Sequence, residues 1–195
     1  MDPINLLVGL NLFVSMSANL TAAKKGLRTK FTGAKEKPIS YLQKIPPNIA
    51  ALVLVLLILG VFKIFTLSAE YEEQFFNLRV IGLVVFLVFS WVQVYAFKSL
   101  GENYAQDIVI FKNHELHKKG LYGIIRHPQY LSQILSDMGA AVALLSYVAF
   151  PVILLVEIPL FILRARYEDQ LLEKHFGDEF KAYKKKTGFM IPFIG

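Results

Sequence analysis

Long apolar segments, separated by polar ones, set the pattern of the chain. The segments predicted to form membrane-spanning helices are residues 4–23, 48–67, 78–97, 128–145 and 151–163. An α-helix needs about 20 mostly apolar residues to cross a bilayer. The last two segments come from one apolar stretch that is too long for a single crossing, and Pro151 near its middle cannot continue a helix cleanly. The sequence therefore predicts a helical hairpin there, with its second helix continuing into the tail.

The basic residues predict the orientation of these helices. Nineteen of the 21 Lys and Arg residues lie in residues 24–44, 98–128 and 164–195, which the predicted spans place on one side of the membrane. Cytoplasmic loops carry the excess of Lys and Arg in membrane proteins. We therefore expect an all-α, polytopic integral membrane protein with five transmembrane helices in a single domain over all 195 residues. Its N-terminus would lie outside, and its helical C-terminal tail would be cytoplasmic.

Composition supports this class and excludes several others. The chain is 55% hydrophobic and 18% charged, with a net charge of +6 and no cysteine, whereas soluble domains carry about 25% charged residues. The positive charge is explained as an orientation signal, so we expect no nucleic-acid partner. The absence of cysteine excludes disulfides, thiolate metal sites and a cysteine nucleophile. Two basic residues outside the pattern, Lys63 and Arg79, fall near span ends, where we expect their long side chains to snorkel.

Arg126, His127 and Pro128 stand at the predicted start of the fourth span. Proline fits the first turn of a helix, where its missing N–H costs nothing, and this places His127 at or near the N-cap. The free N–H groups and the positive end of the helix dipole then face the membrane boundary beside Arg126 and form a candidate anion site. The alternative interpretation is a basic membrane flank that ends at a proline.

Two predicted helices carry polar stripes, Glu157, Arg164 and Glu168 on one and Tyr130, Gln133 and Asp137 on the other. The members of the first stripe lie within about 40° of one another on a helix, and we expect the two stripes to face each other. Ionisable groups at membrane depth are costly and indicate function. Asp137 and Glu157 could equally seal the hairpin by hydrogen bonds, and Arg164 and Glu168 could be an ordinary i, i+4 surface pair.

The four histidines raise the question of a metal site. His114 and His117 are spaced as neighbours on a helix, with Glu115 between them. Membrane di-iron centres need many more clustered histidines, so we expect no metal. No glycine-rich nucleotide motif follows a predicted strand either.

The segment GLYGIIRHPQY, residues 120–130, resembles the G-x-Y-x-x-x-R-H-P-x-Y signature of the isoprenylcysteine carboxyl methyltransferase family. Three later segments resemble motifs of the same family and occur in the same order. They are Arg164-x-x-x-Glu168-Asp169, HFGDEF at residues 175–180 and IPFI at residues 191–194. The resemblance covers about residues 100–195. Within the family, the chain is most similar to small five-span archaeal membrane methyltransferases. Phospholipid N-methyltransferases and membrane sterol reductases share the C-terminal pattern more distantly.

The resemblance implies a site for S-adenosyl-L-methionine, with S-adenosyl-L-homocysteine as the product. The implied cofactor contacts are Gln106, His114, Glu115, Leu116, His117, Tyr122, His127 and Glu168, and Arg126 joins them through the anion site at the helix start. Arg164 matches a residue that faces the methyl acceptor, so Arg164 and Glu168 are the expected catalytic residues. Tyr130 and Glu157 join Arg164 as expected substrate contacts. The chain departs from the family where Asp169 replaces a second Glu and where His117 replaces an apolar residue.

We therefore expect an integral membrane, S-adenosylmethionine-dependent methyltransferase that forms a methyl ester on a lipid-like or prenylated acceptor. The acceptor would enter laterally from the bilayer, and the cofactor from the cytoplasm. Three alternatives stay open. A phospholipid N-methyltransferase-like activity would need a base such as Glu157, Glu168 or His127. An NADPH-dependent membrane reductase would have more spans. A non-enzymatic transporter or scaffold would use Asp137 and Glu157 as an ion relay.

Overall fold

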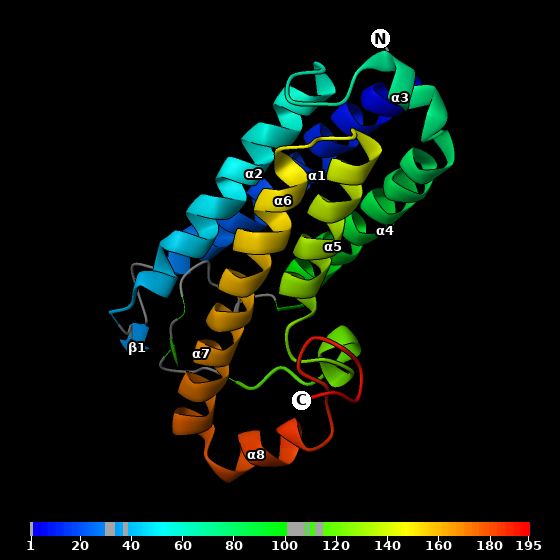
Figure 1. The fold of residues 1–195 in the computed structure, drawn as a ribbon. Helices are drawn as coiled ribbons and strands as arrows, with labels where there is room; N and C mark the ends of the chain where they lie inside the picture. Colours follow the sequence, from blue (N-terminus) through cyan, green and yellow to red (C-terminus); the bar gives the residue numbers. More distant parts are fainter. Residues whose placement is uncertain (1, 30–33, 37–38, 101–107, 109, 112–114) are drawn as a thin grey trace.

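Long helices packed side by side form a bundle in the computed structural model, which describes residues 2–29, 34–36, 39–100, 108, 110–111 and 115–195. The bundle contains α1 (Pro3–Thr29), α2 (Ile45–Val61), α4 (Phe76–Leu100), α5 (Pro128–Ala143) and the continuous run of α6 (Ala149–Val152), η4 (Ile153–Glu157) and α7 (Ile158–Phe176) (Figure 1). The short elements are β1 (Ala34–Glu36), η1 (Tyr41–Gln43), α3 (Ala69–Gln74), β2 (Ile110–Phe111), η3 (Gly120–Gly123) and α8 (Asp178–Lys184). The predicted all-α class is confirmed.

Within the described residues, two helical segments are long and apolar enough to cross a membrane. They are Tyr41–Val61, which runs from η1 through α2, and Phe76–Leu100, which is α4. The predicted segment 78–97 lies inside α4, and the predicted segment 128–145 extends only two residues beyond α5. The number of spans stays a prediction.

The predicted end of the second span at residue 67 is wrong, because α2 ends at Val61. Lys63 and Phe65 adopt left-handed backbone conformations, with φ of 63° and 60°. Thr66 then forms an antiparallel bridge with Ser146, whose hydroxyl donates to the Phe65 carbonyl at 3.2 Å. The apolar residues after Val61 therefore form a turn that pairs with the α5–α6 connection instead of a last helical turn.

Arg79 is buried, which corrects the expectation that it snorkels. Its side chain is 2% exposed, and its Nε donates to the Ala143 carbonyl at 2.9 Å. One terminal nitrogen donates to Asp2 Oδ2 at 2.5 Å and to Asn5 Oδ1 at 2.8 Å. Because burying an arginine is costly unless its donors are paired, the residue ties together the ends of α1, α4 and α5. Lys63 stays at the surface, where it pairs with Glu72 at 2.9 Å.

The tight packing of α4 against α5 depends on two glycines. A Cβ at Gly82 would lie 2.8 Å from the Gly139 carbonyl oxygen, and a Cβ at Gly139 would lie 2.6 Å from the Phe86 nitrogen. Small residues let helix backbones approach closely in membrane proteins. This contact fixes the position of α5, the helix whose first turn carries the Arg126-His127-Pro128 segment.

The last long helix contains a π-helical turn, η4, that ends at Glu157. Pro159 follows in the first turn of α7 and has no N–H to donate to the carbonyl four residues earlier. Pro151 lies in the first turn of α6, where proline is tolerated. α7 runs to Phe176, so the helical backbone continues beyond residue 163, the predicted end of the last span. Gly177, at φ 55°, then turns the chain into α8.

One small sheet was not predicted. β1 pairs with β2 in antiparallel fashion, with Ala34 opposite Phe111. Strands of three and two residues are too short for an alternating pattern to be recognised. The pairing joins the α1–α2 connection to the segment before η3, so two polar regions far apart in the sequence lie at the same end of the bundle.

Candidate active site

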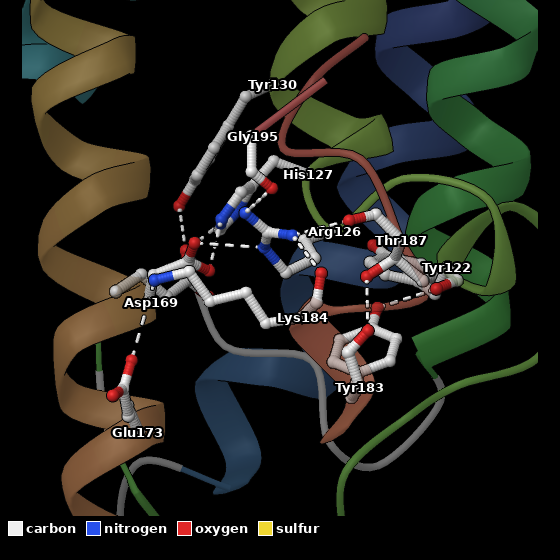
Figure 2. Close-up of polar contacts among 11 residues, drawn as sticks. Tyr122, Arg126, His127, Tyr130, Asp169, Glu173, Tyr183, Lys184, Thr187 and Gly195 are labelled. Carbon is white, nitrogen blue, oxygen red and sulfur yellow. Dashed lines mark hydrogen bonds and ion pairs between the residues drawn. The ribbon is translucent and has the colours of Figure 1, made fainter. Parts of the chain in front are cut away.

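The start of α5, the second half of α7 and the segment after α8 meet at one end of the bundle (Figure 2). Backbone pairing brings the first and last of these together. The Arg126 N–H donates to the Gly188 carbonyl at 2.9 Å, and the His127 N–H donates to the Phe189 carbonyl at 3.2 Å. Pro128 begins α5 directly afterwards, as predicted, with His127 at the N-cap.

Asp169 binds both basic residues of this segment. Its Oδ2 accepts from Arg126 Nε at 3.0 Å, and its Oδ1 lies 2.8 Å from His127 Nε2. Burial alone would raise the pKa of Asp169, but the hydrogen bond and charge of His127, and then of Arg126, outweigh it and hold that pKa below its usual range. Asp169 is therefore an ionised, structurally engaged carboxylate.

The rest of the Arg126 guanidinium holds the C-terminal segment. It donates to the backbone carbonyls of Thr187 at 2.7 Å, Gly195 at 3.2 Å and Lys184 at 3.3 Å. Arg126 is 5% exposed. Its donors are thus committed to protein partners, which differs from the open anion site expected at the helix start.

Tyr130 lies between Arg164 and Glu168. Its hydroxyl accepts from Arg164 Nε at 3.0 Å and donates to Glu168 Oε2 at 2.9 Å. The His127 ring stacks on the Tyr130 ring, with centroids 5.6 Å apart and planes 10° apart, and His127 Nδ1 lies 3.8 Å from Glu168 Oε2. The structure therefore brings together four residues that the sequence singled out on α5 and α7.

The α1–α2 connection supports Arg164 from the other side. A terminal nitrogen of Arg164 donates to the Leu42 carbonyl of η1 at 2.6 Å. The buried Gln43 amide, next in the chain, donates to the Ile108 carbonyl at 2.8 Å and accepts from the Ile108 N–H at 2.9 Å. Gln43 thus holds the backbone of Ile108 as a neighbouring strand would, and it was not predicted as a site residue.

Several predicted cofactor contacts precede η3. Gln106 and His114 lie outside the described residues. Glu115 is exposed, Leu116 is partly buried, and the His117 ring packs edge-on against Tyr122 at 5.3 Å. Burial, with a smaller effect of Lys119, lowers the pKa of His117.

Tyr122 connects this segment to α8. Its backbone carbonyl accepts from the Tyr183 hydroxyl at 2.6 Å, and the buried Tyr183 carbonyl accepts from Thr187 Oγ1 at 2.9 Å. Burial raises the pKa of Tyr183 to about 12. Tyr122, Tyr183 and Thr187 therefore lock η3 against the C-terminal segment that Arg126 holds (Figure 2).

Glu157 lies away from these contacts, about 10 Å along the helix from Arg164, given a rise of about 1.5 Å per residue. Its side chain is fully buried. It interacts electrostatically with Asp137. The stripes predicted on the two helices thus face each other, but Glu157 and Glu168 belong to different clusters.

Asp169 was not predicted to be a site residue, although its position in the sequence indicates that it is buried. It lies four residues after Ala165 and eight after Phe161, and all three are buried. This i, i+4 spacing marks the inward face of the helix. It identifies Asp169, more than Glu168, as the acid that points into the protein.

Similarity to known proteins identifies the family to which this chain belongs. A family model described as phospholipid methyltransferase matches residues 78–179, just over half of the chain. The probable protein-S-isoprenylcysteine O-methyltransferase of Oryza sativa subsp. indica is 31% identical over 133 residues, 66% of this chain and 68% of that protein. The protein-S-isoprenylcysteine O-methyltransferase of Saccharomyces cerevisiae is 29% identical over 117 residues, 59% of this chain and 49% of that protein.

The fold also resembles a solved structure, that of the eukaryotic intramembrane Ras methyltransferase ICMT. The TM-score is 0.65 at 21% sequence identity, over 100% of this chain and 69% of that chain. Fold and site together define an α-helical integral membrane protein with a polar centre where α5 and α7 meet. The chain belongs to the isoprenylcysteine carboxyl methyltransferase family. It spans from about half to two thirds of the length of these curated relatives.

Proposed function

We propose that this protein transfers a methyl group from S-adenosyl-L-methionine to the carboxylate of a lipid-like or prenylated acceptor. Family membership supports methyl transfer, and the names of the relatives indicate O-methylation of an isoprenylcysteine. Two hydrogen bonds of the Tyr130 hydroxyl, one from Arg164 and one to Glu168, support the proposal most directly, because they hold a cation and a carboxylate side by side. Arg164 is 3% exposed and supplies a buried positive charge, whereas the Glu168 side chain is 33% exposed.

The available carboxylate fits the cofactor. The ammonium and ribose hydroxyls of S-adenosylmethionine are hydrogen-bond donors, and they need an accessible acceptor. Asp169 is enclosed by Arg126 and His127, so the accessible acid of the pair is Glu168. We assign Glu168 this role, and we propose Glu115, Leu116 and His117 as further cofactor contacts, as the family resemblance implies. When bound, the cofactor supplies an electrophilic methyl group on a sulfonium.

Arg164 would orient the acceptor. A carboxylate is already anionic and needs no base, and the positive charge of a guanidinium attracts it. The bonds from Arg164 to Leu42 and Tyr130 fix the guanidinium before the acceptor arrives. Correct positioning alone can supply roughly 7–11 kcal/mol of barrier reduction. Arg126 is then a positioning residue, which holds Asp169 and the C-terminal segment in place.

An amine acceptor is the second candidate, because the matching family model is described as phospholipid methyltransferase. An amine must lose a proton, and Glu168 beside His127 is the pair placed to take it. The two acceptors differ in product. Mild base hydrolyses a methyl ester and releases its methyl group as methanol, whereas an N-methyl group stays on the product.

We also propose the five-span topology, with the N-terminus outside and the active site cytoplasmic. The distribution of Lys and Arg supports it. Because the chain has no cysteine, single introduced cysteines test it directly. Lys185→Cys should react with a membrane-impermeant maleimide only after the cytoplasmic face is opened, and Glu73→Cys should react in intact cells. The reverse pattern would refute the orientation.

Calorimetry on the purified protein in detergent tests the activity class. We expect saturable binding of S-adenosylhomocysteine and none of NADPH. Tight NADPH binding would favour a reductase. The absence of binding by either ligand would favour the transporter or scaffold alternative, in which Asp137 and Glu157 would be the sensitive residues.

A further inference from the structure

The turn that precedes α2 presents two backbone carbonyls to the proposed active site. Arg164 Nη1 donates to the Leu42 carbonyl at 2.6 Å and to the Gln43 carbonyl at 3.4 Å. In an α-helix each of these carbonyls would accept from the N–H four residues later. Those later residues are Pro46 and Pro47, which have no N–H to donate. The guanidinium therefore binds two carbonyls that the prolines leave without their usual helical partner.

Local hydrogen bonds fix the shape of this turn, which is η1. The Ser40 hydroxyl accepts from the Leu42 N–H at 3.2 Å, and the Ser40 carbonyl accepts from the Gln43 N–H at 3.1 Å. The Lys44 N–H donates to the Tyr41 carbonyl at 3.1 Å. All of these partners lie within the turn, so they set its conformation but not its place relative to α7. That place depends on contacts with other parts of the chain.

The side chain of Gln43 supplies such a contact. It is buried, and its amide donates to the Ile108 carbonyl at 2.8 Å and accepts from the Ile108 N–H at 2.9 Å. Ile108 is buried as well and forms a small apolar cluster with Leu171 of α7, against which Tyr167 packs. A buried donor or acceptor that loses its partner is costly. The amide therefore holds η1 firmly to the backbone of Ile108.

The apolar cluster packs against the turn of α7 that bears Glu168. Leu171 lies three residues after Glu168, which makes the two side chains neighbours on the helix surface. Arg164 lies about one turn before Glu168 on the same helix. Gln43 thus joins the carbonyls that bind Arg164 to the helical turn of Glu168. This connection is separate from the one through the Tyr130 hydroxyl.

We propose that Gln43 is a positioning residue of the methyl-transfer site, and that it makes the binding of cofactor and acceptor cooperative. The inference rests on the function proposed above, in which Glu168 binds the cofactor and Arg164 the acceptor. A cofactor held by Glu168 stabilises the turn of α7 against which Ile108 packs. Through Gln43 it also stabilises the carbonyls that fix Arg164. Coupling between two binding sites is reciprocal, so the acceptor raises cofactor affinity by the same factor.

Gln43→Met tests the coupling, because methionine is similar in length to glutamine but has no amide. Calorimetry on the full chain in detergent measures S-adenosylhomocysteine affinity with and without saturating N-acetyl-S-farnesylcysteine, a prenylated carboxylate. No methyl transfer occurs in this mixture, because S-adenosylhomocysteine has no methyl group to give. We expect the acceptor to lower the Kd of the wild type by at least about fivefold and that of Gln43→Met by less than about twofold. Gln170→Met, at an exposed position of α7, is the matched control and should keep the wild-type factor.

A purely structural role of Gln43 would give a different result. It would lower the unfolding temperature of the variant but leave the ratio of the two affinities unchanged. Gln43→Asn is a milder second variant, because it keeps an amide on a side chain that is too short to reach both backbone groups of Ile108. We expect it to lose the coupling as well. A folded Gln43→Met or Gln43→Asn protein with the wild-type factor would overturn the proposal, and so would a wild type without coupling.

Turnover tests whether Gln43 acts through Arg164. Gln43→Met alone should lower kcat about tenfold, because the guanidinium is no longer held in its productive position. In an Arg164→Ala background the same change should lower kcat less than about twofold, since no guanidinium is left to position. Equal losses in both backgrounds would overturn the inference. A wild type that binds no S-adenosylhomocysteine and transfers no methyl group would instead overturn the proposed function, and this inference with it.

Discussion

The hydroxyl of Tyr130 on α5 donates a hydrogen bond to Glu168 Oε2 on α7 at 2.9 Å, so an uncharged phenol links the two helices. The same oxygen accepts from Arg164. One phenol therefore separates the cation assigned to the acceptor from the carboxylate assigned to the cofactor. Changes at these three residues should have distinguishable effects.

Tyr130→Phe removes the shared hydroxyl and keeps the ring. We expect kcat to fall about tenfold, because a hydrogen bond to a charged group contributes about 1.5–3 kcal/mol and Arg164 loses one of its fixed partners. S-adenosylhomocysteine affinity, measured by calorimetry, should change by less than about threefold, since Glu168 keeps its charge. A variant with unaltered kcat would show that the hydroxyl does not position Arg164.

Glu168→Ala should weaken S-adenosylhomocysteine binding by about 1.5–3 kcal/mol, the contribution of a hydrogen bond to a charged group. Glu173→Ala, on the same helix and paired with Lys184 at 3.6 Å, is the matched control and should bind normally. Calorimetry in detergent measures both. An unchanged affinity in Glu168→Ala would mean that the cofactor site has been placed wrongly.

Arg164→Ala should leave S-adenosylhomocysteine binding intact and reduce kcat by about 10²–10³, the effect of losing one preorganised electrostatic contact. Arg166, two residues later, is exposed, so Arg166→Ala should behave as the wild type. Methyl transfer to a prenylated carboxylate acceptor is the assay. Equal losses of turnover in both variants would point to a general charge effect.

Asp169→Ala leaves the buried Arg126 without its carboxylate. Removing one partner of a buried ion pair costs about 3–5 kcal/mol, so we expect a large fall in thermal unfolding temperature in detergent. Glu168→Ala should change that temperature little, because Glu168 is partly exposed. Similar unfolding temperatures for the two variants would contradict the structural role of Asp169.

The lowered pKa of Asp169 predicts a specific acid sensitivity. A carboxyl group whose pKa is lower in the folded state stabilises the fold above its ordinary pKa of about 3.9, and the contribution is lost as the pH falls through the lowered value. The unfolding temperature of the wild type should therefore fall steeply at acid pH. Asp169→Asn has no carboxyl to protonate, so its acid slope should be shallower. Identical slopes would exclude Asp169 as the group responsible.

The positions of the helices could be predicted well where apolar runs coincide with helix-compatible backbone. The segments 78–97 and 128–145 match α4 and α5 closely. The end of α2 was missed because four of the six residues 62–67 are large and apolar, so the apolar run continues past Val61. Lys63 and Phe65 nevertheless adopt left-handed conformations, next to the pairing of Thr66 with Ser146. Hydropathy carries no information about backbone handedness.

The site could be predicted by residue type but not by partner. The sequence indicated Arg126, His127, Arg164 and Glu168 as site residues, but it predicted that Arg126 would lie beside an open anion site. The carbonyls that occupy Arg126 belong to residues 184–195, and contacts across such sequence separations leave no periodic signal. Gln43 was missed for the same reason, since its partner Ile108 lies 65 residues away.

The carbonyl of Leu42 has a consequence for exchanging parts between relatives. The family match begins at residue 78, yet a terminal nitrogen of the Arg164 guanidinium is bound by a connection that precedes it. A chimera that joins residues 78–195 of this chain to the first helices of another member would need a compatible turn at residues 41–43. Transplanting that turn along with the C-terminal part should decide whether such a hybrid works.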